Sequence, residues 1–140
     1  MIKHDLTHFP LIISIIEDKP TLEEQKQFFQ EWMKWFEKDE PFVTLRIYKN
    51  IGALVQPEGS REQSKNWFIE NIELIRNKVI AMATVVPLDI EKRHQNKPNI
   101  GIQTEIFIDQ KAAVEWLLSQ LNYKHYGLNQ QEIIKTLSQV

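Results

Sequence analysis

The stretch LIISIIEDKPTLEEQKQFFQEWMKWFEKDEPFVTLRIY, residues 11–48, places two apolar runs on either side of an amphipathic segment. The first run, residues 11–16, is continuous and rich in β-branched side chains, which predicts a strand buried on both faces. Residues 42–48 predict a second strand. A strand–helix–strand unit of this kind is typical of a mostly parallel sheet with helices packed on it.

The helix between these strands is the clearest local pattern of the chain. Thr21 followed by Glu24 forms a capping box at its start, and Pro41 ends it. On a helical wheel of ~100° per residue, the apolar side chains of residues 22–38 fall within one arc, together with a single glutamine. We expect this arc to face the sheet, with Trp35 at its edge and partly exposed. Its members are Leu22, Gln25, Phe28, Phe29, Trp32, Met33, Trp35 and Phe36.

The same alternation of strands and helices continues downstream. Ser60 followed by Gln63 predicts a second capping box that opens a helix. Asp109 and Asn129 stand where the N-caps of two later helices are expected. The expected elements are a helix over 60–76, strands over 79–86 and 102–108, a helix from 109 to about 121, and a short amphipathic helix over 128–140.

These elements predict an α/β fold with a mostly parallel sheet of four to five strands and packed helices. We expect a single domain over residues 1–140, with a core at 9–121 and an additional C-terminal helix at 128–140. Local patterns leave the strand order open. They also leave open whether the last helix docks on its own domain or on a second copy of the chain.

The composition excludes several functional classes. The chain has 140 residues, 42% hydrophobic and 26% charged, which is ordinary for a globular protein. The absence of cysteine removes disulfides, thiolate nucleophiles and cysteine-bound metals. A net charge of −2 does not indicate nucleic-acid binding. The apolar run at 9–16 is too short to span a bilayer and the N-terminus lacks a signal-peptide pattern, so we expect a cytoplasmic protein.

The order of motifs resembles small bacterial proteins of the STAS/SpoIIAA-like class. These proteins are related to anti-sigma-factor antagonists and, more loosely, to the lipid-binding Sec14 shape. The resemblance covers about residues 9–121 and rests on apolar patterns. The motifs are Phe9-Pro10 before an apolar strand, Pro20-Thr21 before an aromatic helix, Pro41-Phe42-Val43 opening a strand, a helix that carries Trp67 and ends near Asn71, the strand VIAMATVV, and a final strand–helix pair with Trp116.

This resemblance implies a compact regulatory or interaction module. In phosphorylated members of the class, a serine stands at the start of the helix that follows the second crossover strand. Ser60, and less closely Ser64, occupy that neighbourhood here, without the Asp-Ser pair typical of the site. The residues themselves predict Ser60 as an N-cap, with a phosphoacceptor or anion site as the functional alternative.

Other candidate site residues are polar groups in two segments. Ser64 and Asn71 fall inside the apolar arc of the second helix, where they would either line a small polar pocket or be satisfied by the backbone. Asp89, Lys92 and Arg93 lie in a polar segment, where they would either contact an acidic partner or phosphate, or form a solvated loop.

The N-terminal histidines are the remaining candidate. His4 and His8 would share one face of a helix and could bind a metal there, but no third ligand is suggested by the spacing. We therefore expect a solvated, loosely ordered N-terminus and no metal site. The sequence carries no phosphate-binding glycine motif, no HExxH and no GxSxG, and no catalytic residue is predicted.

The sequence thus predicts a non-enzymatic regulatory or protein–protein interaction module without a cofactor. Its expected partner is a protein, with a second copy of the chain as one alternative. A binding module for a lipid or another small apolar ligand is the second hypothesis, because the chain is rich in aromatic residues.

Overall fold

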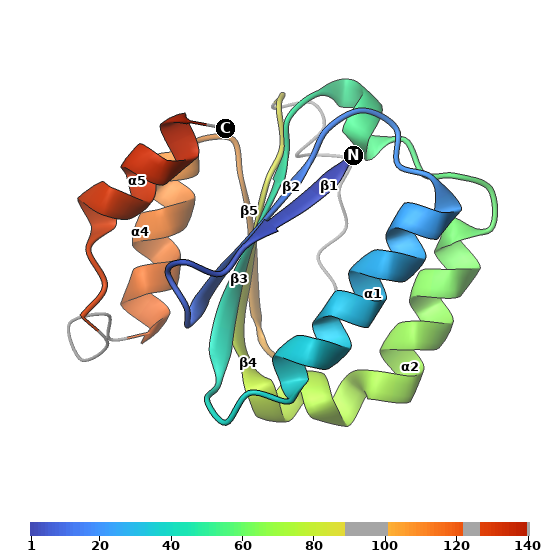
Figure 1. Cartoon of the computed structure of the whole chain (residues 1–140), viewed down its shortest axis with the longest axis horizontal. Coiled ribbons are helices and arrows are strands. Elements are labelled where there is room, and N and C mark those ends of the chain that lie inside the picture. Colours follow the sequence, from blue (N-terminus) through green and yellow to red (C-terminus); the bar gives the residue numbers. More distant parts are fainter. Residues whose placement is uncertain (89–100, 122–126, 140) are drawn as a thin grey trace.

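The computed structural model of the chain describes residues 1–88, 101–121 and 127–139. Five strands form one sheet in the order β1-β2-β3-β4-β5 (Figure 1). β1 runs antiparallel to β2, and the other neighbouring strands are parallel. The predicted mostly parallel α/β sheet is therefore confirmed. The strands are β1 (Ile2–Asp5), β2 (Leu11–Ile16), β3 (Phe42–Tyr48), β4 (Val79–Val85) and β5 (Gln103–Phe107).

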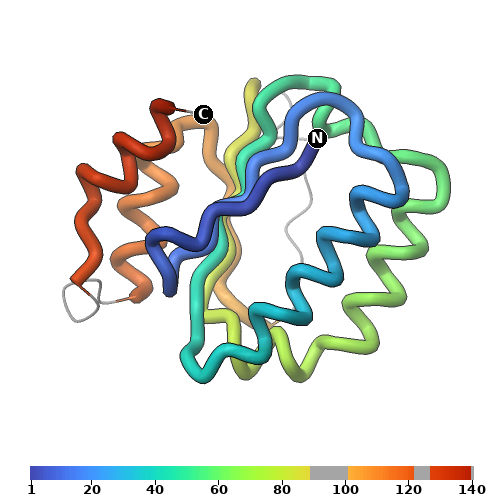
Figure 2. The backbone as a smooth tube through the Cα atoms, viewed as in Figure 1, coloured from blue at the N-terminus to red at the C-terminus, as the bar shows by residue number. Residues whose placement is uncertain are grey.

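Helices cover both faces of this sheet (Figures 1 and 2). α1 and α2 lie on one face, and α4 lies on the other with α5 packed against it. A short 3-10 helix, η1, connects β3 to α2 and was not predicted. The bounds are α1 (Leu22–Phe36), η1 (Ile51–Leu54), α2 (Ser60–Lys78), α4 (Gln110–Leu121) and α5 (Gln130–Ser138).

The interior strand β2 shows why both faces are covered. All six of its residues are buried, as the continuous apolar run predicted. Ile12 and Ile16 belong to the core beneath α1 and α2, whereas Leu11, Ile13 and Ile15 belong to the core beneath α4. Successive side chains of a strand point to opposite faces. A strand with apolar side chains on both faces therefore needs apolar partners on both sides of the sheet.

The capping box of α1 is present as predicted, but one edge of its buried arc differs. The Thr21 hydroxyl accepts from the Glu24 amide, and the Glu24 carboxylate accepts from the Thr21 amide. Trp35 was expected to be partly exposed and is only 1% exposed, whereas Leu22 and Met33 are 41% and 39% exposed. The buried face of the helix is thus rotated toward Trp35.

The cause is a strand that sequence reasoning missed. The N-terminus forms β1, which pairs with β2 from Ile2 opposite Ile16 to Asp5 opposite Ile13. The expectation of a loosely ordered end was therefore wrong. β1 extends the sheet beneath α1, and the ring of His4 lies 5.2 Å from the ring of Trp35. A four-residue strand at the edge of a sheet has too few residues for a periodicity signal.

The C-terminal helix docks on its own chain. Ile133 is fully buried and Leu137 is 4% exposed, and both belong to the core cluster between α4 and the sheet. Asn129 caps α5 with its side chain, as predicted. The side chain of Asp109 accepts from the amide of Lys111 at the start of α4, which also agrees with its predicted role.

Candidate functional site

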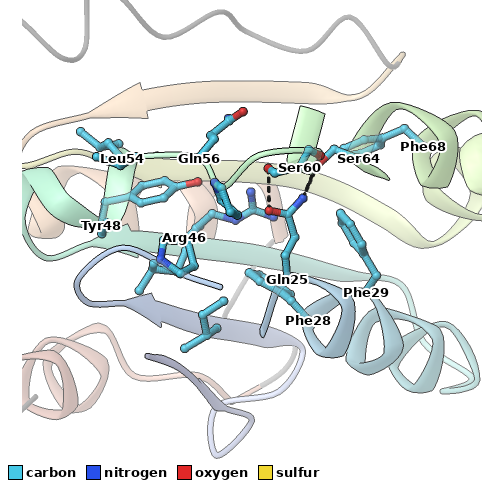
Figure 3. A pocket seen from close by; sticks show the side chains of 16 residues that line it. Gln25, Phe28, Phe29, Arg46, Tyr48, Leu54, Gln56, Ser60, Ser64 and Phe68 are labelled. Atoms are coloured by element: carbon cyan, nitrogen blue, oxygen red, sulfur yellow. Dashed lines mark hydrogen bonds between the residues drawn. The ribbon is translucent and has the colours of Figure 1, made fainter. Parts of the chain in front are cut away.

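A cavity lies where β2 and β3 end, on the face covered by α1 and α2 (Figure 3). Its volume is about 110 Å³. Its walls come from β1, β2 and β3, from the N-terminal halves of α1 and α2, and from the segment that contains η1. Ligands of open α/β sheets gather at the carboxyl ends of the strands, which is where this cavity opens.

A hydrogen-bond network centred on Gln25 forms one wall. The Gln25 amide nitrogen donates to Ser64 Oγ at 2.7 Å and to the Ser60 carbonyl at 3.1 Å. The Ser60 hydroxyl donates to Gln25 Oε1 at 2.8 Å. Figure 3 shows the two side-chain bonds as dashed lines between α1 and α2. The network explains why a glutamine occupies the apolar arc of α1: it ties that helix to the first turns of α2.

This network overturns the predicted capping role of Ser60. The N-cap of α2 is Gly59, with a left-handed φ of 84°, and it provides no side-chain capping bond. Ser60 is the first residue of the helix and is 1% exposed. Its hydroxyl bonds to a residue 35 positions away, so the predicted pairing with Gln63 does not form. The partner comes from another helix, and local spacing carries no signal for it.

The structure brings together only some of the predicted site residues. Ser60 and Ser64 both line the cavity. Asn71 does not line it, and its amide nitrogen donates to the Trp67 carbonyl at 2.9 Å within the same helix. The roles of Ser60, Ser64 and Asn71 in binding stay predictions. Asp89, Lys92 and Arg93 lie outside the described residues.

Arg46 is a residue of the cavity that sequence reasoning missed. It is the single charged side chain among the 16 residues that line the cavity. Its guanidinium carbon lies 4.8 Å from the centre of the Phe28 ring, in the geometry of a cation–π contact. The available signal was an arginine inside the otherwise apolar or uncharged strand FVTLRIY, at a position that shares one face with Phe42 and Tyr48.

His4 lies two strands away from Arg46, in the same row of the sheet. It pairs in register with Ser14, which pairs in turn with Arg46. His4 Nδ1 and Ser14 Oγ are 2.8 Å apart, and the Phe28 ring lies 4.8 Å from the imidazole. Burial lowers the pKa of His4 below 6.5; the Arg46 charge also lowers this pKa, and Glu31 opposes the shift.

We expect the stability of the protein to fall as the pH falls below 6.5, the ordinary pKa of histidine. In this range the unfolded chain binds a proton at His4 before the folded protein does, which favours unfolding. His4→Asn should reduce this dependence, as measured by urea unfolding between about pH 7.5 and about pH 5.5. Lys3→Asn, an exposed change on the same strand, should keep the wild-type profile. Identical pH profiles for His4→Asn and wild type would show that His4 does not cause the loss of stability at low pH.

The predicted alternative of a metal site at the N-terminus is not supported by this geometry. His4 contacts α1 through Phe28, whereas His8 Nε2 lies 2.9 Å from the hydroxyl of Thr136 on α5. The two imidazoles therefore meet helices on opposite faces of the sheet. Within residues 1–88, 101–121 and 127–139, no three histidine or acidic side chains are grouped to hold a metal ion.

A second recess is the groove between the outer surfaces of α1 and α2. Its volume is about 500 Å³ and it is open to solvent. The Phe29 and Trp67 rings line it and stack on each other at 4.7 Å with an interplanar angle of 13°. Met33 also lines it and is 39% exposed. Its other lining residues are polar, namely Lys26, Gln30, Gln63, Asn66, Glu70 and Asn71.

Comparison with known proteins shows the class of fold. No family model and no curated protein match the chain. Among solved structures, it is similar to an uncharacterized protein from the DUF3478 family of Shewanella loihica PV-4, described as having a SpoIIAA-like fold. The TM-score is 0.56 at 12% sequence identity, over 84% of this chain and 92% of that chain. The fold of the protein is therefore SpoIIAA-like, as the sequence resemblance implied.

The helices of the described residues are α1, α2, α4 and α5, together with the short η1. None of them combines the length and the apolar character needed to cross a bilayer.

Proposed function

We propose that the protein is a non-enzymatic regulatory module that binds a partner protein in the groove between α1 and α2. The observation that carries this proposal is the lining of the groove, where the stacked rings of Phe29 and Trp67 and the 39% exposed Met33 lie among polar side chains. The centres of protein–protein interfaces are enriched in aromatic residues and methionine, and their rims are polar. The SpoIIAA-like fold agrees with this role.

The geometry of this lining suits an apolar side chain of the partner. Stacking of Phe29 on Trp67 holds both rings in one orientation, so little conformational entropy is lost on binding. Met33 is unbranched and adapts to the shape of what it contacts. A partner that inserts one or two apolar side chains would remove all three from water.

The non-enzymatic part of the proposal rests on the sequence. It contains none of the phosphate-binding, zinc-protease or nucleophile-elbow motifs, and it has no cysteine. A cytoplasmic location belongs to the same proposal.

The alternative of a lipid-binding module has less support. Pockets that enclose a lipid or another ligand of that size usually measure about 300–1,000 Å³. The groove between α1 and α2 reaches about 500 Å³, but it is open to solvent and does not enclose a ligand. The cavity at the ends of β2 and β3 measures about 110 Å³ and is partly lined by Arg46 and two serines. It offers no room for a long acyl chain.

Met33→Glu tests the groove. We expect wild-type bait to recover a stoichiometric partner from native lysate and Met33→Glu to recover at least about tenfold less, because a charge would be desolvated at the interface. Ile108→Glu is the matched control, since Ile108 is 43% exposed and follows β5. Gel-based quantification of partner against bait gives the ratio.

Three results would change the proposal. Equal recovery by all three baits would move the interface away from the groove. Failure of the wild-type bait to recover any partner would reject the interaction module. Light scattering that shows a wild-type dimer and a Met33→Glu monomer would identify a second copy of the chain as the partner.

A further inference from the structure

We propose that the cavity at the ends of β2 and β3 binds a small organic anion, a short-chain carboxylate, through Arg46. This site is separate from the groove between α1 and α2, and the proposal does not depend on the partner protein. It rests on the charge, the hydrogen-bond donors and the size of the cavity.

The charge of the cavity is uncompensated. Arg46 is half-buried, and no acidic residue is among the 16 that line the cavity with it. Its guanidinium forms no hydrogen bond or ion pair with the described part of the chain. Cations that burial removes from water are normally paired, and Arg46 is partly removed from water. A bound anion would supply the missing partner.

The orientation of Arg46 leaves its donors available. The guanidinium carbon lies over the Phe28 ring, 4.8 Å from its centre. A cation–π contact uses no hydrogen-bond acceptor, so the N–H groups of the guanidinium remain available to the two oxygens of a carboxylate. Figure 3 shows Arg46 from β3 and Gln25 from α1 directed into the same cavity.

The Gln25 network leaves the hydroxyl of Ser64 as a second hydrogen-bond donor to a ligand, in addition to Arg46. Both hydrogens of the Gln25 amide are used, one toward the Ser60 carbonyl and one toward Ser64 Oγ. The Ser60 proton is used as well, toward Gln25 Oε1. Ser64 acts in this network as an acceptor, so its own proton is available for an oxygen of a ligand. The network thus presents Ser64 in a defined orientation before any ligand binds.

The remaining walls select an organic monoanion. Apolar side chains such as Ile16, Leu54 and Phe68 face the same space as Arg46. A single cation balances one negative charge, and a phosphate dianion would leave a second charge with no cation among the lining residues to balance it. A cavity of about 110 Å³ is somewhat smaller than a cavity of roughly 150 Å³ that holds a benzene molecule. This space fits a chain of a few carbons, and a fatty acid is too long for it.

Calorimetric titration of the full chain with butyrate tests the site, with butyramide as its uncharged analogue. We expect butyrate to bind and butyramide to bind at least about tenfold more weakly. Arg46→Met should weaken butyrate binding by about tenfold to a hundredfold. Arg61→Met should leave it within about twofold, because Arg61 is exposed on the first turn of α2 and does not line the cavity.

The comparison of butyrate with butyramide uses the wild-type protein and does not depend on the folding of a variant. Equal binding of the two probes would overturn the proposal that the cavity recognises the negative charge of a carboxylate. The absence of butyrate binding would overturn it as well. Tighter binding of inorganic phosphate than of butyrate would overturn the choice of a monoanion. Octanoate binding at least about tenfold tighter than butyrate would overturn the size limit and favour a lipid chain.

Discussion

Trp35→Ala is expected to lower the free energy of unfolding by about 4 kcal/mol, the range found for large aromatic residues removed from a core. Trp35 is 1% exposed and its ring lies 5.1 Å from that of Trp32. It also meets His4 on β1 at 5.2 Å and Phe42 on β3 at 6.5 Å. Its removal would therefore leave a void between α1 and two strands.

Urea unfolding followed by circular dichroism measures this effect. Domains of this size have free energies of unfolding of about 5–15 kcal/mol, so the loss would be a large part of the total. Met33→Ala is the matched control on the same helix, since Met33 is 39% exposed, and it should change stability by less than about 0.5 kcal/mol. A loss below about 1 kcal/mol for Trp35→Ala would contradict the buried position of this side chain.

Ile133→Asp should have an effect of similar size, about 5 kcal/mol, because it removes a buried side chain and leaves an unpaired charge. Ile133 is fully buried on α5, in the core cluster that also contains Leu117 of α4. This substitution tests whether α5 packs on its own chain, as the structure shows, or packs on a second copy of the chain.

The control for this experiment is Gln131→Asp, which introduces the same charge at an exposed position of α5. It should leave the free energy of unfolding within about 0.5 kcal/mol of wild type. Light scattering on the same samples reports the mass. Ile133→Asp with unchanged stability but a reduced mass would place α5 against a second copy and contradict the docking described above.

Several elements could be predicted from local sequence because their causes are local. The capping box at Thr21 depends on two residues three positions apart, and both of its hydrogen bonds form. The run Leu11–Ile16 predicted a strand covered on both faces, and the structure confirms it. The N-cap at Asn129 likewise needs only the amides of the next turn.

The cavity could not be predicted in the same way. Ser60 matched a capping box, yet its hydroxyl bonds to Gln25 across 35 positions of the chain. Arg46 lies in a strand whose remaining pattern is apolar or uncharged, and its place in the cavity depends on α1 and α2 folding over that strand. Burial on the wheel of α1 was misjudged at Trp35 because β1 was not expected beneath it.

By itself, the sequence determined the type and order of most elements and the presence of a mostly parallel sheet, because periodicity and capping are set by neighbours within a few residues. Tertiary structure alone decided the strand order, the added strand β1 and the meeting of Arg46, Gln25 and Ser64 around one cavity. The physical reason is that a contact between distant residues is stabilised only when a whole sheet and its covering helices bury their apolar faces together.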